Sequence, residues 1–288
     1  MRIPESELII NSDGSAFHIH IKPEQLADRV IVVGDPGRVD MMAEMLDSIE
    51  CRNASREFVS CTGSYKGTRM TFLSTGIGTD NIDIVMTELD ALANIDFATR
   101  TVKPEHRRLT VLRIGTCGAL QPYIPLGSFI LSHISIGFDG LLNWYENRES
   151  LEDFEEDFKK HMNWARHLPD PYFVKASDKI IKAFEPYTVK GMTISAPGFY
   201  GPQGRVVRLG LAMPDMLDRC ASFDHNGWKI TNLEMEGSAL AGLAGKLGHD
   251  AATVCCAIAN RSLKESNADY KPKVKELVKL SLDIMASI

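Results

Sequence analysis

Residues 109–118 read Leu-Thr-Val-Leu-Arg-Ile-Gly-Thr-Cys-Gly. The first six of them form a short, largely apolar run, which is typical of a strand buried inside a sheet. The run ends at Gly115-Thr116-Cys117-Gly118, which predicts a glycine turn directly after the strand. Because glycine has no side chain, such a turn lets the backbone come close to a ligand and present its N–H groups.

Two other predicted strands end in the same way. Residues 30–33 lead into Gly34-Asp35-Pro36-Gly37-Arg38, and residues 68–74 lead into Thr75-Gly76-Ile77-Gly78. Strands and helices alternate along the chain, which predicts an α/β fold with a largely parallel sheet. The other expected strands cover residues 57–65, 128–135, 189–196, 230–233 and 251–259, and the helices cover residues 39–46, 80–92, 149–160, 177–184, 215–223, 235–247 and 274–285.

Composition excludes several classes of protein. The 288 residues contain no internal repeat or linker-like tract, which predicts a single domain over residues 1–288. A formal net charge of -6 argues against general nucleic-acid binding, which needs a dense basic surface. No stretch approaches the roughly 20 apolar residues that span a bilayer. Residues 1–11 lack the pattern of a signal peptide, and the six cysteines form no CxxC pair. We therefore expect a cytoplasmic protein whose partners include neither nucleic acid nor membrane.

Arginines at the edges of the glycine loops indicate a site for an anion. Arg38 follows the first loop, Arg113 precedes the third, and Arg56 precedes the predicted hairpin. The planar guanidinium group matches phosphate oxygens with paired hydrogen bonds, and Thr116 adds a hydroxyl donor. The sequence therefore predicts a pocket for a small phosphate near the carboxyl ends of the strands, where α/β sheets bind ligands.

Other interpretations of these motifs are weaker. Gly76-Ile77-Gly78 matches only part of a dinucleotide fingerprint, and no Walker-type loop occurs. His18 and His20 alternate as on one strand face, but a bound metal normally needs three or four ligands, so we expect no metal there. Glu234 and Glu236 precede a predicted helix, where the helix dipole favours acidic residues without any catalytic role.

At these loops the chain resembles the nucleoside phosphorylase family, and within it the uridine phosphorylase branch. The resemblance covers the chain from about Phe17 to the C-terminal helix, and the ordered series of motifs is specific although each motif alone is not. The motifs are Phe17-His18, Gly34-Asp35-Pro36-Gly37-Arg38, Arg56-Glu57-Phe58, Ser74-Thr75-Gly76-Ile77-Gly78, Leu112-Arg113-Ile114-Gly115-Thr116-Cys117-Gly118-Ala119, Phe199-Tyr200-Gly201-Pro202-Gln203-Gly204-Arg205, Glu234-Met235-Glu236 and Asn260-Arg261.

The resemblance implies a three-layer α/β/α fold around a mixed, largely parallel sheet, and it implies roles for individual residues. It assigns phosphate binding to Gly34, Arg38, Arg56, Arg113 and Thr116, with Arg56 reaching a neighbouring subunit. It assigns ribose binding to His18, Met235 and Glu236, and base binding to Phe199, Gln203, Arg205 and Arg261. Arg113, Arg205 and Glu236 are then the catalytic residues, and inorganic phosphate is a co-substrate with no cofactor needed.

The implied reaction is phosphorolysis of uridine, with deoxyuridine and thymidine as further substrates to test. The purine branch carries an aspartate after its penultimate strand, whereas this chain has Ala259-Asn260-Arg261-Ser262 there. A departing uracil anion needs donors at its oxygens, which Gln203 and Arg205 offer. A purine phosphorylase, a nucleosidase of the same fold and a non-catalytic nucleoside-binding paralogue are the alternatives.

The resemblance also implies a homo-oligomer with shared active sites, at least a dimer, with a hexamer left open. In some relatives a monovalent cation lies between subunits near the positions of Glu57 and Ile77, and Asn81 departs from the usual turn there. Residues 143–171 are longer than in bacterial relatives, which predicts a surface insertion that alters one oligomer interface.

Overall fold

One mixed sheet dominates the computed structural model, which describes residues 2–148 and 150–288. Twelve strands belong to it, and a small hairpin of β5 and β6 stands apart. The strands are β1 (Arg29–Val33), β2 (Ser48–Ser55), β3 (Phe58–Tyr65), β4 (Thr68–Ser74), β5 (Ile95–Asp96), β6 (Thr101–Val102), β7 (Thr110–Ala119), β8 (Phe129–Gly137), β9 (Tyr172–Lys175), β10 (Val189–Ser195), β11 (Asp224–His225), β12 (Trp228–Glu234), β13 (Asp250–Asn260) and β14 (Glu265–Ser266).

Part of this sheet closes on itself. The main strand order is β11-β12-β10-β8-β13-β7-β1-β4-β3-β2, and β12 also pairs with β7. That pairing joins Leu233 to Gly118 and Asn232 to Ala119, so β12, β10, β8, β13 and β7 form a ring. Closure brings the end of β7 beside the end of β12, although the two segments are far apart in sequence.

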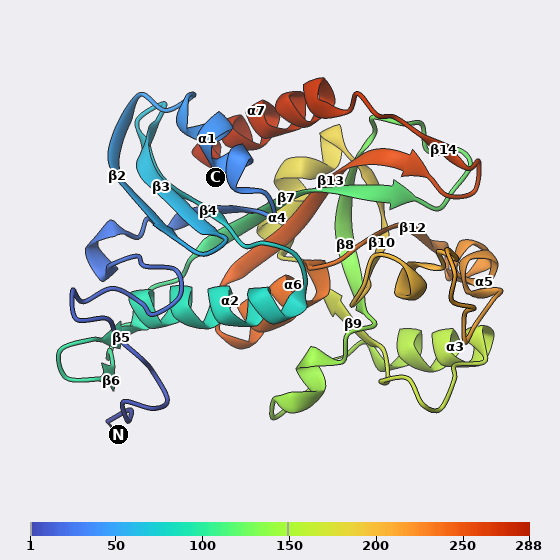
Figure 1. The fold of residues 1–288 in the computed structure, drawn as a ribbon, viewed down its shortest axis with the longest axis horizontal. Helices are drawn as coiled ribbons and strands as arrows, with labels where there is room; N and C mark the ends of the chain where they lie inside the picture. The colour runs from blue at the N-terminus through green and yellow to red at the C-terminus, as the bar shows by residue number, and fades with distance from the viewer. Residues whose placement is uncertain (1, 149) are drawn as a thin grey trace.

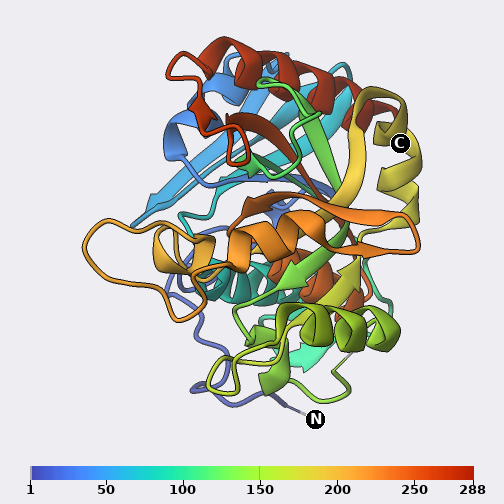
Figure 2. The ribbon, with the colours of Figure 1, turned by 90° about the vertical axis from the view of Figure 1, so that its right-hand side faces the viewer.

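The described part of the chain forms seven α-helices, which pack around the sheet (Figure 1). They are α1 (Pro36–Ala43), α2 (Thr79–Asn94), α3 (Glu152–Met162), α4 (Asp178–Phe184), α5 (Met216–Ser222), α6 (Gly237–Lys246) and α7 (Lys271–Ser287). Short 3-10 helices cover Pro23–Gln25, Leu141–Trp144, Glu185–Tyr187 and Gly201–Gln203. Figure 2 shows the segment between the last 3-10 helix and α5 projecting from the body of the molecule.

The two faces of the sheet bury separate cores. In β1, Val30 and Val32 pack with helices α2 and α6, whereas Ile31 and Val33 pack with α1, α4 and α7. Successive side chains of a strand point to opposite faces, so an apolar run without polar alternation requires cover on both sides. The prediction of a three-layer α/β/α fold around a mixed sheet is therefore confirmed.

Several local expectations differ from the structure. Strand β7 continues to Ala119, so the glycine turn predicted at residues 115–118 is wrong. Strand β2 was not predicted, because its residues are mostly polar and its exposed side leaves no apolar run. His18 lies in a turn and His20 directly after it, so neither is on a strand.

The charged helix predicted over residues 149–160 is α3, and it begins at Glu152. Residue 149 lies outside the described part of the chain. This helix is more than a surface element, because Phe158 and Met162 are fully buried against Phe223 and Phe138. Among residues 2–148 and 150–288, no helix combines the length and the apolar character that crossing a membrane requires.

Candidate active site

A cavity of about 750 Å³ opens where β1, β4, β7, β12 and β13 end. Most of the predicted site residues line it, although the segments that carry them are dispersed along the chain. The lining residues from the predicted set are Gly34, Arg38, Arg113, Thr116, Phe199, Gln203, Arg205, Met235 and Glu236. Glu57 and Ile77, where a monovalent cation was considered, line it as well.

The guanidinium groups of Arg38 and Arg113 line the end of the cavity beside the first glycine loop. Arg38, from the first turn of α1, donates from Nη1 to the carbonyl oxygen of Ile114 over 3.1 Å. Burial, and then the nearby charge of Arg113, lower the pKa of Arg38 below its ordinary value. An anion bound between two positive charges offsets their mutual repulsion. Gly34 allows the adjacent loop to close, since a Cβ there would lie 3.2 Å from the carbonyl oxygen of Gly76.

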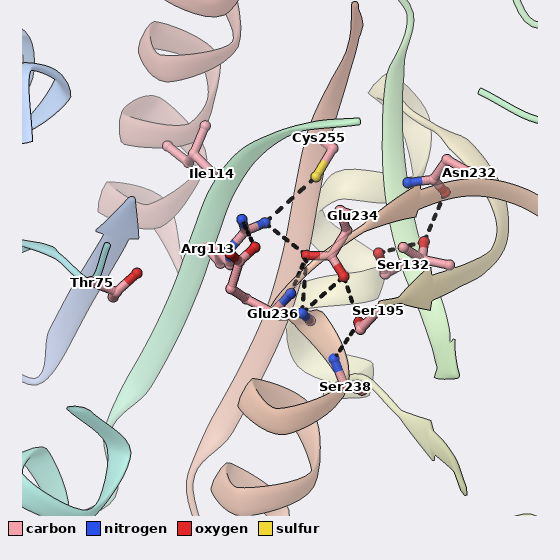
Figure 3. A network of polar contacts seen from close by, with 12 residues as sticks. Thr75, Arg113, Ile114, Ser132, Ser195, Asn232, Glu234, Glu236, Ser238 and Cys255 are labelled. Atoms are coloured by element: carbon pink, nitrogen blue, oxygen red, sulfur yellow. Dashed lines mark hydrogen bonds and ion pairs between the residues drawn. The ribbon is translucent and has the colours of Figure 1, made fainter. Parts of the chain in front are cut away.

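Arg113 is the centre of a buried ionic network (Figure 3). Its Nη1 lies 3.0 Å from Oε2 of Glu234, and its Nη2 is bonded to Oε2 of Glu236. Oε1 of Glu236 accepts from the backbone N–H of Gly78 over 2.8 Å, at the start of α2. The network therefore ties together β7, the turn after β12 and the N-terminus of α2.

Burial and pairing act in opposite directions on these charges. Burial alone lowers the pKa of Arg113, but Glu236 and then Glu234 outweigh it and raise that pKa above the ordinary value. Burial raises the pKa of Glu236, Arg113 opposes the shift, and Glu234 adds to it. A guanidinium that stays charged beside an acceptor-only carboxylate suits the binding of an anion and of a diol in one pocket.

The glycines of β7 have a function different from the predicted turn. A Cβ on Gly115 would lie 2.4 Å from Nη1 of Arg113 and 2.9 Å from Sγ of Cys255. A Cβ on Gly118 would lie 3.2 Å from Cγ of Arg261. These glycines therefore keep the strand extended while leaving room for two arginine side chains on it. Burial raises the pKa of the neighbouring Cys117 thiol, which disfavours the thiolate that a cysteine nucleophile requires.

The other end of the cavity is built by the loop after β10. The guanidinium of Arg205 lies 3.7 Å from the ring centroid of Phe199 and donates over 2.7 Å to Oε1 of Gln203. Arg261 donates to the backbone carbonyl of Gln203 over 3.1 Å, so it supports the loop without lining the cavity. Burial, and then the charge of Arg261, lower the pKa of Arg205 to about 10. This end presents cationic and amide donors beside an aromatic ring.

Besides Arg261, two predicted residues lie outside the cavity of their own chain. Arg56 is exposed in the turn between β2 and β3 with a φ of 53°, next to the lining residue Glu57. The backbone and ring of His18 are held by Glu88, with 2.6 Å between Nδ1 and Oε1. Both residues were expected to act across a subunit interface, and that expectation remains a prediction.

The structure also adds residues that the motifs did not assign. Glu234 lines the cavity, as do Asp35 and residues 266–268 at the end of β14. Glu234 is only 3% exposed, and its place two residues before Glu236 was the available signal. Residues 266–268 carried no such signal, because they come near the cavity only through the pairing of β14 with β13.

One group of metal-ligand types occurs among the described residues, at Asp90, His106 and His249, away from the cavity. Both ring nitrogens of His249 are already bonded there. Nδ1 accepts from the N–H of Leu109 over 3.1 Å, and Nε2 lies 3.1 Å from Oδ1 of Asp90. Because a neutral imidazole has one donor and one acceptor nitrogen, this ring has no lone pair left for a metal. The group is better explained as structural hydrogen bonding.

The sequence and structural comparisons agree with this geometry. A model of the phosphorylase superfamily matches residues 28–287. The chain belongs to the phosphorylase superfamily. A nucleoside phosphorylase from Trypanosoma brucei that shows uridine phosphorylase activity has a similar structure, with a TM-score of 0.90, 30% identity and coverage of 98% of this chain and 100% of that one.

Two curated members of the superfamily carry different names. A uridine phosphorylase from Thermococcus kodakarensis is 29% identical over 88% of this chain and 80% of its own length. A purine nucleoside phosphorylase (DeoD-type) from Alkaliphilus metalliredigens is 30% identical over 83% of this chain and 85% of its own length. The resemblance to nucleoside phosphorylases is confirmed. The chain is similar over most of its length both to an enzyme named for a pyrimidine nucleoside and to one named for purine nucleosides.

Proposed function

We propose that this member of the superfamily is a uridine phosphorylase, a pentosyltransferase that converts uridine and phosphate to uracil and ribose 1-phosphate. The observation that carries the proposal is the base end of the cavity. Arg205 and Gln203 offer hydrogen-bond donors there, and Arg261 adds positive charge behind them. A uracil anion leaving the sugar is stabilised by such preplaced donors and cations.

The segment where the purine branch has an acid supports the same choice. Asn260 is buried and donates to the carbonyl oxygens of Gln121 and Ile124, each over 3.0 Å. Its own carbonyl accepts from the backbone N–H groups of Ser262 and Leu263. The amide nitrogen is thus bonded to the segment after β7 and the amide oxygen to the turn after β13, so this position has no acid or free donor for a purine ring nitrogen.

In the proposed reaction, phosphate binds at Gly34, Arg38, Arg113 and Thr116, and the ribose hydroxyls donate to Glu236. The bond between ribose and base stretches, and the sugar gains positive charge that the phosphate stabilises. A phosphate oxygen then bonds to the anomeric carbon while the electron pair of the broken bond leaves with the base, towards Arg205. Positioning and electrostatics do the catalysis, and the mechanism needs neither a covalent enzyme intermediate nor a cofactor.

We further propose a homo-oligomer, at least a dimer, in which Arg56 and His18 complete the site of the neighbouring subunit. The exposure of Arg56, beside the cavity residue Glu57, supports this arrangement. In the cell the enzyme would serve pyrimidine nucleoside salvage in the cytoplasm.

A purine nucleoside phosphorylase is the second candidate, because the Alkaliphilus relative with that name is similar over most of the chain. Release of free base from uridine, thymidine and inosine, with and without phosphate, separates the candidates. We expect base release from uridine only when phosphate is present. Release from inosine would favour the second candidate, release without phosphate would indicate hydrolysis, and no release from any substrate would contradict both.

A further inference from the structure

Glu234 is a buried carboxylate to which the motifs assign no substrate contact. It ends β12, one residue before the Met235-Glu236 pair, and it is 3% exposed. Its Oε2 accepts from the backbone N–H of Glu236 over 3.0 Å, and both of its oxygens lie 3.0 Å from the N–H of Gly237. These bonds hold the turn that presents the carboxylate of Glu236.

The same carboxylate also holds the phosphate end of the cavity. Oε2 of Glu234 lies 3.0 Å from Nη1 of Arg113, while Glu236 occupies Nη2 (Figure 3). When Glu234 is removed, the fixed fork of the guanidinium loses one of its two ion pairs, and Glu236 and a weaker contact of Nη1 with Sγ of Cys255 over 3.8 Å are left to orient it. Nε of Arg113 has no partner among the described residues, so the two carboxylates are its principal anchors.

Glu234 is itself held from behind. Ser195, at the end of β10, donates its hydroxyl to Oε1 of Glu234 and accepts from the backbone N–H of Ser238 over 2.8 Å. Space is also reserved for the carboxylate, since a Cβ on Gly237 would lie 3.1 Å from its Oε1. A side chain with this many fixed partners has one orientation, which is the property that a positioning residue requires.

We propose that Glu234 is a positioning residue that keeps the phosphate-binding Arg113 and the ribose-binding Glu236 in register with each other. The inference rests on the proposed phosphorolysis and deepens it, by linking the two substrate subsites through one side chain. A competing view makes Glu234 only a counter-charge to Arg113. The two views predict opposite changes in phosphate affinity when the charge of Glu234 is removed. If Glu234 were only a counter-charge, its loss would make the pocket more positive, and the pocket would bind phosphate more tightly.

The test uses Glu234→Gln in the full-length protein, with inorganic phosphate as the probe in isothermal titration. The amide keeps the size of the side chain and can still accept from Arg113 and the turn, with its NH₂ towards the Ser195 hydroxyl. Loss of one charge-assisted anchor should weaken phosphate binding on the order of tenfold or more. In turnover, KM for phosphate should rise more than KM for uridine, since the N–H groups of Glu236 and Gly237 can still donate to the oxygen that remains.

Glu155→Gln is the matched control. Glu155 is also buried and paired with Arg148 and Lys159, but it lies on α3 outside the cavity. We expect a lowered melting temperature with unchanged phosphate affinity for this variant. Glu234→Asp, which keeps the charge but shortens the reach, should fall between wild type and Glu234→Gln.

Phosphate affinity within about twofold of wild type, or tighter, in folded Glu234→Gln would overturn the inference. If that variant does not fold, Ser195→Ala removes one support of the carboxylate and should weaken phosphate binding to a smaller degree; unchanged binding there would equally overturn it. Wild-type protein that binds phosphate without releasing uracil would refute the uridine reaction alone, because the titration needs no nucleoside. Wild-type protein that does not bind phosphate would refute both.

Discussion

Gly115→Ala tests the geometry of the phosphate site with a single methyl group. The added Cβ would lie 2.4 Å from Nη1 of Arg113, and ordinary contacts begin at 3.4 Å. The guanidinium must therefore move by about 1 Å, or the strand must shift by a similar distance. Its two carboxylate partners, Glu234 and Glu236, oppose any such movement.

The expected losses follow from that displacement. A misplacement of about 1 Å in a group that positions substrate costs on the order of 100-fold in rate. Crowding a packed interior costs roughly 1–3 kcal/mol of unfolding free energy. We expect kcat/KM for phosphate to fall by about two orders of magnitude, with a lower melting temperature. The assay follows uracil release at varied phosphate and saturating uridine, alongside thermal unfolding.

The control is Gly245→Ala, because a Cβ on that glycine of α6 meets nothing within 4 Å. Alanine there should leave turnover unchanged and stabilise the helix by roughly 0.5–1 kcal/mol. If folded Gly115→Ala retains wild-type kinetics with phosphate, the placement of the Arg113 guanidinium over Gly115 is incorrect and the reasoning fails.

Three further predictions concern single residues of the cavity. Arg113→Ala should lose roughly 3–5 kcal/mol of stability, because two buried carboxylates lose their partner. Titration of this variant should show a larger loss of affinity for phosphate than for uridine. Equal losses of the two affinities would contradict a phosphate-binding role for Arg113. Gln203→Ala should lower kcat/KM for uridine relative to inosine, and an unchanged ratio would remove this side chain from the base subsite. Because burial raises the pKa of Glu236, uridine affinity measured by titration against pH should fall, on acidification, at a pH above the ordinary glutamate pKa of 4.5. Between the ordinary and the raised pKa the folded protein binds more protons than the unfolded chain, so the contribution of Glu236 to stability becomes less favourable as pH rises through that window. The fall in affinity should be absent in Glu236→Gln, and its persistence there would assign it to another group.

Local sequence patterns predicted much of the architecture. The apolar runs at β1 and β7 identified buried strands, because a strand covered on both faces has apolar side chains in both of its alternating rows. The arginines Arg38 and Arg113 also indicated an anion site, since their side-chain chemistry does not depend on the fold. Strand β2 escaped prediction because an edge strand with polar, exposed residues lacks that local pattern.

The local order of the chain thus determined the alternation of strands and helices, the positions of most of them, and the polar residues that gather at strand ends. Only the tertiary structure decided how those residues pair. Arg113 and Glu236 are 123 positions apart, and they meet because β12 closes onto β7. The requirement for glycine at position 115 depends on the same closure. A side chain is excluded there only because Glu234 and Glu236 hold the guanidinium of Arg113 over this residue. Local patterns specify backbone conformation, whereas long-range packing determines which buried charges become partners.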